Sequence, residues 1–560
     1  MDTYMIMHQP YGLDAYAVSS DTLHIRLRAK KSAFLQVVIH YKNLYDHTSP
    51  PKEKAMDILL DDGDSVLYEV AIQVPEKHFK YYFSLHRSMQ EPVCFTADGI
   101  MKAALPSNYF YYPQINDDDV ISLPEWAEGA LIYQILVDRF YDQDSRNNPP
   151  HTKSWSELPD RHTYYGGDFQ GIVAKLDYLV DMGVEIIYLS PVFLSPSYHK
   201  YDVSDYSRIE EIYGGKDALK DLVDEAHAKG IKILLDGVFN HCSSAHPFFQ
   251  DVLKNQADSP YRHWFKLEDF PVSVAKGNYD HFANQVPTMP KFNTAHQEVI
   301  EYLTTQSLYW VEELGIDGYR LDVADEVSHR FWRYFYQNLK AKHPELLIIG
   351  EIWNYATSWL IHREMDSVTH YKLRQLMLEL MTNAIDVPTF IQRYQHQYAH
   401  YPTPFFTYLV SLVGSHDTLR LIRAVQDECL HHLTLRLMLA LPGMPLIYYG
   451  DEYALDGGED PDNRRAMVWD NPPSEAVEMT KRFARLRSTS PVLKKGRIQF
   501  LEPQPHVLRF LRTYQNQKYL IVLNLSQEDY FEPLPIQKDL LTDHQDHRVK
   551  AQSMRWYELI

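Results

Sequence analysis

The sequence predicts an α/β protein: a parallel (β/α)8 barrel with a small inserted domain after its third strand, an N-terminal β-sandwich and a C-terminal β domain. Apolar and polar residues alternate near both ends of the chain, which is typical of half-buried strands. Between these regions, apolar runs of strand length alternate with helical segments, the pattern of parallel β/α units. Eight such runs occur, the number that closes a TIM barrel.

Residues 1–126 are expected to form the N-terminal sandwich. In TLHIRLRAK, the side chains of Leu23, Ile25 and Leu27 share one face of a strand. The same alternation occurs in FLQVVIHYKNLYD, VLYEVAIQVP and FKYYFSLH, and the turn-like stretches SSD, DDGD and PEKH separate these strands.

Residues 127–494 are expected to form the barrel, with strands in LIYQILVDRF, VEIIYLSP, IKILLDGVFNH, IDGYRLDV, LLIIGEIW, DSVTHY, FFTYLVSLVG and MPLIYYGDE. A long stretch with prolines and aromatic residues, 242–296, separates the third strand from the helix TAHQEVIEYL, so we expect an inserted domain there. Alternation returns in RIQFLEP, HVLRFLRTY and KYLIVLNLS, which predicts a C-terminal β-sandwich over residues 495–560.

Charge and composition exclude several classes of partner. The 560 residues include 55 Lys and Arg against 75 Asp and Glu, a formal net charge of -20. This charge repels phosphate backbones and anionic lipids, so we expect neither nucleic acid nor membrane as a partner. The first residues show no signal-like segment and no stretch is long enough to span a membrane, which predicts a cytoplasmic protein. Cys94, Cys242 and Cys429 match no zinc spacing and are expected to be reduced thiols.

Charged and polar residues cluster at the ends of the predicted barrel strands: Asp236, Arg320, Asp322, Glu351, His416 and Asp417. The carboxyl ends of the strands form the active face of such a barrel. A single acid there is more often a structural ion pair or a helix cap, but a group of this size indicates catalysis. Opening a glycosidic bond needs two carboxyl groups in different protonation states, and a third can hold the sugar.

The motifs DGVFNH, GYRLDVADE, GEIW and SHD, in this order between Leu131 and Trp469, resemble those of the α-amylase superfamily, glycoside hydrolase family 13. Within it, MPKFN, the VADE stretch, YYGGDFQGI and the leading sandwich are similar to the neopullulanase, cyclomaltodextrinase and maltogenic amylase group. The stretch AYAVSSDTLHIRLRAKK resembles that group's starch-binding-like N-terminal domain.

The resemblance implies that Asp322 is the nucleophile and that Glu351 protonates the leaving oxygen and then activates water, with retention of the α-configuration. Such a pair lies about 5–5.5 Å apart. Arg320 and Asp322, two positions apart on a strand, face the same way, so the guanidinium should favour the ionised form of Asp322. Glu351, near two other carboxylates, should stay protonated.

The same resemblance implies contacts to the sugar that is cleaved. Asp417 would bind its hydroxyl groups and help to distort the ring, while His416 and His241 donate hydrogen bonds that strengthen in the transition state. Tyr201 would stack beneath the sugar, and His199 would line the same pocket. A lone histidine is more often structural, but these stand in matching motifs.

The resemblance also assigns residues to the parts of the site that lie away from the cleaved bond. Trp353 is expected on the leaving-group side, and Asp460 and Arg464 of EDPDNRR are expected to bind the distal glucose. Two residues depart from the group's pattern: Asp325 replaces the usual Asn, and Asn354 replaces the common His after the Trp. Both are expected to border the leaving-group subsites, where they affect the balance between hydrolysis and transglycosylation.

A structural calcium site is also implied by the resemblance, although the chemistry itself needs no metal. Hard cations take oxygen ligands, and the alternative is a solvated turn rich in Asp and Asn. The implied ligands are Asp142, Asp144, Asn147, Asn148, the Gly166 carbonyl and Asp168.

The expected function is that of a retaining α-glucan hydrolase that cleaves α-1,4 bonds in cyclodextrins, maltooligosaccharides and pullulan, with some transglycosylation. The resemblance also implies a homodimer, in which the N-terminal domain covers the partner's active site. An α-glucosidase or oligo-1,6-glucosidase is the alternative enzyme, against which the sandwich and MPKFN argue. A non-catalytic sugar-binding relative is a third alternative, against which the retained acids argue.

Overall fold

The computed structural model describes residues 5–559, which divide into two compact units. The first unit contains the chain up to Leu123 together with Pro388–Phe406, and the second contains Pro124–Val387 and the chain from Thr407 onwards. Within the described residues, the helices are all too short or too polar to cross a membrane.

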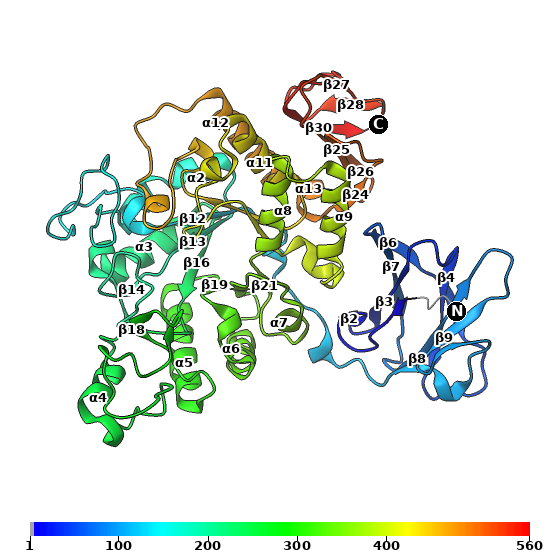
Figure 1. The fold of residues 1–560 in the computed structure, drawn as a ribbon, viewed down its shortest axis with the longest axis horizontal. Coiled ribbons are helices and arrows are strands. Elements are labelled where there is room, and N and C mark those ends of the chain that lie inside the picture. Colours follow the sequence, from blue (N-terminus) through cyan, green and yellow to red (C-terminus); the bar gives the residue numbers. More distant parts are fainter. Residues whose placement is uncertain (1–4, 560) are drawn as a thin grey trace. The chain divides into compact units, whose positions relative to one another are not determined.

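The first unit contains two antiparallel sheets that form the predicted β-sandwich (Figure 1). One sheet has the order β1-β3-β7-β6, with β2 beside β3, and the other has the order β10-β9-β8-β4-β5, with β11 beside β8. The strands are β1 (Ile6–Met7), β2 (Ala15–Ser19), β3 (Thr22–Lys30), β4 (Gln36–Asn43), β5 (Lys52–Ala55), β6 (Asp57–Asp61), β7 (Ser65–Gln73), β8 (Phe79–His86), β9 (Val93–Thr96), β10 (Gly99–Met101) and β11 (Phe110–Tyr112).

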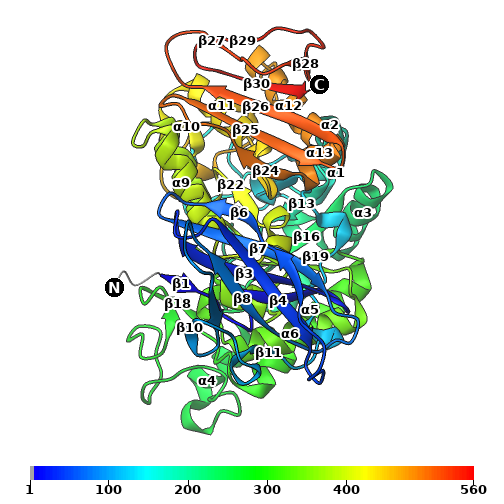
Figure 2. The ribbon, with the colours of Figure 1, turned by 90° about the vertical axis from the view of Figure 1, so that its right-hand side faces the viewer.

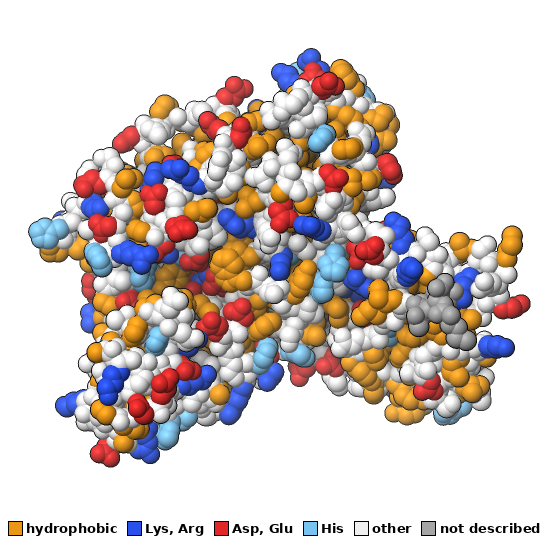
Figure 3. Space-filling view, viewed as in Figure 1, with side chains coloured by type: hydrophobic (Ala, Val, Ile, Leu, Met, Phe, Trp, Pro, Cys, Tyr) orange, Lys and Arg blue, Asp and Glu red, His pale blue; other side chains and the backbone are white. Residues whose placement is uncertain are grey.

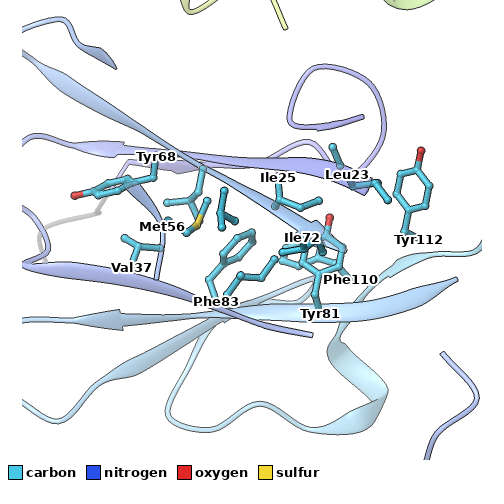
Figure 4. Packing of buried hydrophobic residues seen from close by; sticks show 14 of the residues in the cluster. Leu23, Ile25, Val37, Met56, Tyr68, Ile72, Tyr81, Phe83, Phe110 and Tyr112 are labelled. Carbon is cyan, nitrogen blue, oxygen red and sulfur yellow. The ribbon is translucent and has the colours of Figure 1, made fainter. Parts of the chain in front are cut away.

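The sandwich core lies between these sheets (Figure 4). Leu23, Ile25 and Leu27 of β3 are fully buried, as their alternation predicts. They pack in one cluster with Tyr81 and Phe83 of β8. Truncating a core aromatic such as Phe83 to alanine would cost about 3–5 kcal/mol, so this cluster accounts for much of the unit's stability.

A buried polar network joins the segment Pro388–Phe406, which includes most of α9 (Val387–Tyr398), to the N-terminal strands. The guanidinium of Arg26 donates to Glu69 Oε1 (3.0 Å), to the Tyr401 carbonyl (2.6 Å) and to Thr403 Oγ1 (2.7 Å). The Tyr16 hydroxyl also donates to Glu69 (2.7 Å). The boundaries read from the sequence do not anticipate this grouping, because it depends on residues far apart in the chain.

The second unit is built around the predicted barrel (Figure 1). The parallel strands run in the order β21-β20-β19-β16-β13-β12-β23-β22, and a bridge between Thr369 and Val410 joins the two ends. Each lies inside one of the runs predicted from the sequence. The strands are β12 (Ile132–Ile135), β13 (Ile186–Leu189), β16 (Lys232–Gly237), β19 (Gly318–Leu321), β20 (Leu347–Gly350), β21 (Ser367–Val368), β22 (Val410–Leu412) and β23 (Met444–Tyr448).

Helices follow the strands, and their apolar faces are buried. In α6, for example, the Ser328 side chain caps the first turn, and Phe331, Phe335 and Leu339 recur at helical spacing on the buried face. The helices are α1 (Phe169–Ala174), α2 (Leu176–Met182), α3 (Gly215–Ala228), α5 (Gln297–Leu314), α6 (His329–Lys342), α7 (Thr357–Ile361), α8 (Tyr371–Met381), α10 (Leu421–Val425), α11 (Glu428–Ala440), α12 (Glu475–Thr489) and α13 (Pro491–Lys495).

Two excursions from the barrel carry residues of interest. After β13, a short antiparallel pair, β14 (Phe193–Leu194) and β15 (Asp205–Ile209), encloses the loop HKYD. After β16, a long segment contains α4 (Pro247–Asn255) and the pair β17 (His281–Phe282) and β18 (Val286–Pro290) before α5 begins.

The chain ends in the predicted C-terminal β domain, a sheet in the order β24-β25-β26-β30-β28 with a small second pair, β27 and β29. Helices α11 and α13 contact this sheet, whose strands are coloured orange to red in Figure 2. The strands are β24 (Arg497–Phe500), β25 (Val507–Tyr514), β26 (Gln517–Asn524), β27 (Tyr530–Phe531), β28 (Ile536–Asp539), β29 (Arg548–Val549) and β30 (Ser553–Leu559).

Candidate active site

Three adjacent barrel strands bring the predicted catalytic residues together. In the parallel register, Asp236 of β16 lies opposite Arg320 of β19. Asp322 and Glu351 each stand one residue beyond the ends of β19 and β20, and their N–H groups donate to the carbonyls of Gly237 and Leu321. Because this register continues past the strand ends, residues more than 100 positions apart meet at one edge of the barrel.

The guanidinium of Arg320 is the centre of this cluster. Its Nη1 donates to both oxygens of Asp236 (3.0 and 3.1 Å) and to Asp322 Oδ1 (2.9 Å). Its Nη2 lies 2.9 Å from Glu351 Oε2. All of these side chains are almost completely buried, so a single cation faces three buried carboxyl groups.

This excess of carboxyl groups over cations affects the pKa values of the acids. Burial raises the pKa of Asp236 to about 6, although Arg320 and the hydroxyl groups of Tyr188 and Tyr201 oppose the change. Burial also raises the pKa of Asp322 well above its usual range, and the neighbouring carboxylates add to this effect. The expectation that Arg320 favours the ionised form of Asp322 is correct in sign, but burial outweighs it in the cluster without substrate.

Glu351 is held through one oxygen. Its Oε2 accepts a hydrogen bond from the Val323 N–H (2.9 Å) and lies beside Arg320. A Cβ on Gly350, the residue before it, would lie 2.1 Å from the sulfur of Met365, so a larger residue there would displace that side chain. The carboxyl group is therefore fixed on one side, while Oε1 stays available.

His416 and Asp417 follow β22 and are joined to the loop HKYD. Gln134 Nε2 donates to His416 Nδ1 (2.7 Å), which leaves the ring proton on Nε2. That nitrogen lies 3.0 Å from Asp417 Oδ2 and contacts the Tyr201 hydroxyl, and the Tyr201 and His416 rings stack with an interplanar angle of 4°. Asp417 itself is exposed, whereas His416 is buried.

The remaining histidines of the site are neutral; His241 is buried and His199 is half-buried. Burial lowers the pKa of His199 to about 3, and Arg464 adds to the shift. Burial also lowers the pKa of His241 to about 3. The backbone of His241 pairs with that of Lys291 in an isolated antiparallel β-bridge. This pairing brings the long segment after β16 to this edge of the barrel. Neutral imidazoles suit hydrogen bonding to hydroxyl groups rather than charge neutralisation.

Asp460 and Arg464 form a linked pair beside this cluster. Arg464 Nη1 lies 3.1 Å from Asp460 Oδ1 and donates to the Tyr198 hydroxyl (3.0 Å), while its Nε donates to the His416 carbonyl (3.0 Å). Its Nη2 is 3.7 Å from Asp417 Oδ1. The two predicted distal residues thus connect directly to His416 and Asp417.

Trp353 lies on the outer side. It is 48% exposed, and its ring stacks on Tyr371 at a centroid distance of 3.8 Å and an angle of 3°. Tyr371 itself lines the cavity inside the barrel together with Arg320 and His416. An exposed aromatic face supported from behind can bind the apolar face of a sugar ring.

The loop that follows β12 brings together the residues proposed as calcium ligands. Asp142 Oδ1, Asn147 Oδ1 and Asn148 Oδ1 are buried without a hydrogen-bond partner. Gly166 adopts a φ of +84°, and a Cβ there would lie 2.3 Å from Asn148 Oδ1. Buried oxygens without donors fit a hard cation, so this part of the loop fits calcium.

Two of the proposed ligands have other contacts. The carboxylate of Asp144 pairs with Arg146, through hydrogen bonds of 2.7 Å to each oxygen. Asp168 caps α1 by accepting from the Gly171 N–H (2.6 Å) and also accepts from the Asp144 N–H (2.8 Å). Among residues 5–559, no cluster of three or more histidine, cysteine or carboxylate side chains could hold a metal.

Several residues of the site were not predicted. Tyr188 donates to Asp236, Gln134 binds His416, Tyr198 links Asp460 to Arg464, and Val323 holds Glu351. Tyr188 and Gln134 are polar residues inside predicted buried strands, which is a signal that the sequence contains. Val323 acts through its backbone N–H, so its residue type could not have indicated this role.

Together, these groups supply a carboxyl group with a free Oδ2, a second with a free Oε1, and neutral hydrogen-bond donors at one edge of the barrel. Two such carboxyl groups on one guanidinium can share nucleophilic attack and proton transfer at a single bond. This combination suits the displacement of a glycosidic oxygen.

Comparison with protein families agrees with this chemistry. Residues 134–488 match the family described as alpha amylase, catalytic domain, and residues 1–116 match the alpha amylase, N-terminal ig-like domain. The first match covers more than half of the chain and includes all the residues of the central cluster.

Individual proteins are similar over almost the whole length. Neopullulanase 2 of Thermoactinomyces vulgaris is 38% identical, with 93% of this chain and 90% of that protein covered. The cyclomaltodextrinase of Geobacillus thermopakistaniensis (strain MAS1) is also 38% identical, with 95% and 92% covered. A solved cyclomaltodextrinase structure has a TM-score of 0.91 at 34% identity and covers 99% of both chains.

Proposed function

Because the chain belongs to the α-amylase family and is a glycoside hydrolase, we propose that it cleaves α-1,4-glucosidic bonds in cyclodextrins, maltooligosaccharides and pullulan. The observation that carries this proposal is the placement of Asp322 and Glu351 on the same guanidinium of Arg320. One carboxyl group can attack a sugar carbon while the other protonates the departing oxygen.

In the first step, Asp322 Oδ2 attacks the anomeric carbon, and the proton of Glu351 passes to the glycosidic oxygen as its bond to that carbon breaks. In the second step, Glu351 takes a proton from water, which attacks the same carbon and releases Asp322. Two inversions retain the α-configuration. When a sugar hydroxyl replaces water, the product is a transglycosylation product.

The surrounding groups position the sugar. Asp417 and His416 bind its hydroxyl groups, Tyr201 lies beneath the ring, and His199 and His241 contribute neutral donors. Asp460 and Arg464 bind the next glucose, and Trp353 stacks on the leaving-group side. Asp325 and Asn354 border that side and bias the choice between water and a sugar acceptor.

The direct test is product analysis after equal masses of β-cyclodextrin, pullulan and soluble starch are incubated with the protein. We expect β-cyclodextrin to be opened fastest, to maltose and glucose, with the α-anomer formed first in proton NMR spectra. Release of terminal glucose alone from linear oligosaccharides would instead identify an α-glucosidase, and β-anomers would contradict the roles of Asp322 and Glu351.

A non-catalytic sugar-binding protein is the alternative from another class. Glu351→Gln keeps the shape of the side chain but removes its acid. Calorimetry should therefore detect bound maltooligosaccharide while turnover collapses. Equal turnover in the variant and the parent protein would remove Glu351 from the mechanism.

We further propose that Asp142, Asn147, Asn148 and the Gly166 carbonyl hold Ca²⁺, with Asp144 and Asp168 closing the loop around them. The three buried unpartnered oxygens support this site. The ion would stabilise the loop without taking part in bond cleavage. Chelation by EDTA should lower the melting temperature, and added Ca²⁺ should restore it; Asn147→Ala should abolish this response. An unchanged melting temperature in EDTA would refute the site.

We also propose that the protein is a homodimer that associates through its N-terminal unit. Hydrophobic side chains gather on the part of that unit seen in Figure 3, and most large exposed hydrophobic residues belong to it. Such surfaces mark protein interfaces. The residues are Met5, Met7, Tyr11, Leu35, Tyr45, Ile58, Met89, Ile100, Leu105 and Tyr111.

Sedimentation analysis tests this assembly. Leu35→Glu and Tyr45→Glu should shift the protein toward the monomer, because each places a charge on a 76% or 70% exposed apolar residue. Phe531→Glu, at a 67% exposed residue of the C-terminal domain, is the matched control. A parent protein that sediments as a monomer would contradict the proposal.

The compartment we propose is the cytoplasm. Cys94, Cys242 and Cys429 are all unpaired thiols, which suits a reducing environment. Fractionation of the source cells, followed by immunoblotting, would test this assignment.

A further inference from the structure

Val323, directly after Asp322, has an unusual backbone. Its φ and ψ are +45° and +46°, in the left-handed region that β-branched residues rarely adopt. Its side chain is only half-buried, so its packing does not offset the energetic cost of this conformation. Strain of this kind persists where the surrounding structure enforces it, commonly at functional sites.

Two consecutive N–H groups at this turn donate to one residue, and the left-handed conformation of Val323 orients the second of them. The Val323 N–H donates to Glu351 Oε2 (2.9 Å), and the Ala324 N–H donates to the Glu351 carbonyl (3.1 Å). At Oε2, the Val323 N–H stands beside Arg320 Nη2, which lies 2.9 Å from the same oxygen. The strained residue therefore ties the strand end that carries the nucleophile to the side chain that carries the acid.

This contact distinguishes the two oxygens of Glu351. A protonated carboxyl group has one oxygen that only accepts and one that carries the proton. Oε2 faces both the Val323 N–H and Arg320 Nη2, so it is the accepting oxygen. The proton must then reside on Oε1, which is left for the substrate.

We propose that Val323 is a positioning residue: its N–H binds Oε2 and so presents the proton of Glu351 on Oε1 to the glycosidic oxygen, while its left-handed backbone turns the next N–H, that of Ala324, to the Glu351 carbonyl and keeps the two residues together. This inference rests on the proposed function, because it assigns proton transfer to Glu351. The proton leaves Oε1 for the glycosidic oxygen, whose bond to the anomeric carbon breaks as Asp322 bonds to that carbon. The N–H of Val323 stays in place throughout.

The test replaces the amide at position 323 with an ester by incorporating the α-hydroxy analogue of valine, which removes the N–H and keeps the side chain. Two substrates are compared. β-Cyclodextrin needs a protonated leaving oxygen, whereas α-maltosyl fluoride loses fluoride with little help from an acid. We expect turnover of β-cyclodextrin to fall about tenfold or more, while turnover of α-maltosyl fluoride changes less than about threefold.

Two controls accompany the ester. The same exchange at Ile348, whose N–H donates to Asp366 Oδ2 (2.9 Å) on the strand that leads to Glu351, removes a similar buried bond outside the site. It should lower both turnovers equally or leave them unchanged. Val323→Gly keeps the N–H and adopts left-handed backbone freely, so its ratio of the two turnovers should match that of the parent protein.

The outcomes separate the two proposals. If the parent protein cleaves neither substrate, the proposed function fails. If the parent protein cleaves both and the ester at position 323 lowers both equally, or neither, the positioning role is refuted. A ratio in Val323→Gly as altered as that of the ester would also refute it, because the donor would then not be the cause.

Discussion

Two buried arginines in this molecule both lower the pKa of the acids around them, but the net result differs. In the N-terminal unit, Arg26 faces one carboxylate, Glu69, and its other donors bind a carbonyl and a hydroxyl group. At the barrel mouth, Arg320 faces the carboxyl groups of Asp236, Asp322 and Glu351. Both arginines are buried, so the difference lies in the number of acids for each cation.

The pKa values of these acids depend on how many acids share each arginine. Burial by itself would raise the pKa of Glu69, but His24 and Arg26 outweigh it and hold the pKa well below its usual range. Burial raises the pKa of Asp236 to about 6 despite Arg320. A balanced pair therefore stays charged and holds two segments together, whereas Asp236 and Asp322, which share one cation, have raised pKa values.

The largest effect that follows is on activity. Asp322→Asn removes the nucleophile but leaves Arg320 with two acids, so turnover should fall about 10⁴-fold while the melting temperature stays the same or rises. Steady-state kinetics on β-cyclodextrin, together with a thermal melt, measures both. A large loss of stability would show that the barrel cluster is needed for folding, as the Arg26 network is.

Removing each cation should separate the clusters by stability. Arg26→Met leaves the buried Glu69 without its arginine partner, and should cost about 3–5 kcal/mol at any pH between 6 and 8. Arg320→Met leaves acids that can take up protons, so its cost should be smaller at pH 6 than at pH 8. Urea unfolding at both pH values checks this, and a pH-independent cost at Arg320 would contradict the comparison.

The pH dependence of stability should have opposite signs. The unfolded state releases the proton of Asp236 near pH 3.8, while the folded state keeps it up to about pH 6, so stability falls as the pH rises through this window. The contribution is up to about 3 kcal/mol. Asp236→Asn should remove this fall.

For Glu69, the lowered pKa contributes stability above pH 4.5, the value of a free glutamate, and this stability is lost as the pH falls. Glu69→Gln should therefore reduce the loss on acidification. Urea midpoints between pH 3 and 8 would measure both variants, and parallel curves for parent and variant would refute either assignment.

The smallest expected effect on stability is that of an exposed ion pair, which serves as a control for the buried clusters. Lys220 and Asp224 form an exposed pair one turn apart on α3. Lys220→Ala should change the free energy of unfolding by less than about 0.5 kcal/mol, because water screens such pairs. A change as large as that of Arg26→Met would mean that burial does not explain the difference between the clusters.

Much of this molecule could be predicted from local patterns. The barrel strands, the flanking β domains and the strand-end positions of Asp322, Glu351 and Asp417 follow from hydrophobic periodicity and from charges placed where strands end. These signals lie within a few residues of one another and depend on burial of a face, so an isolated sequence contains them.

Only the tertiary structure decided which groups share a contact. The grouping of Pro388–Phe406 with the N-terminal strands, the three carboxyl groups on Arg320, and the hydrogen bond from Val323 to Glu351 all join residues distant in the chain. The left-handed backbone of Val323 is opposed by its own side chain, so local preference predicts the wrong conformation there. Protonation at the site likewise depends on the sum of burial and neighbouring charges, which exists only once the chain has folded.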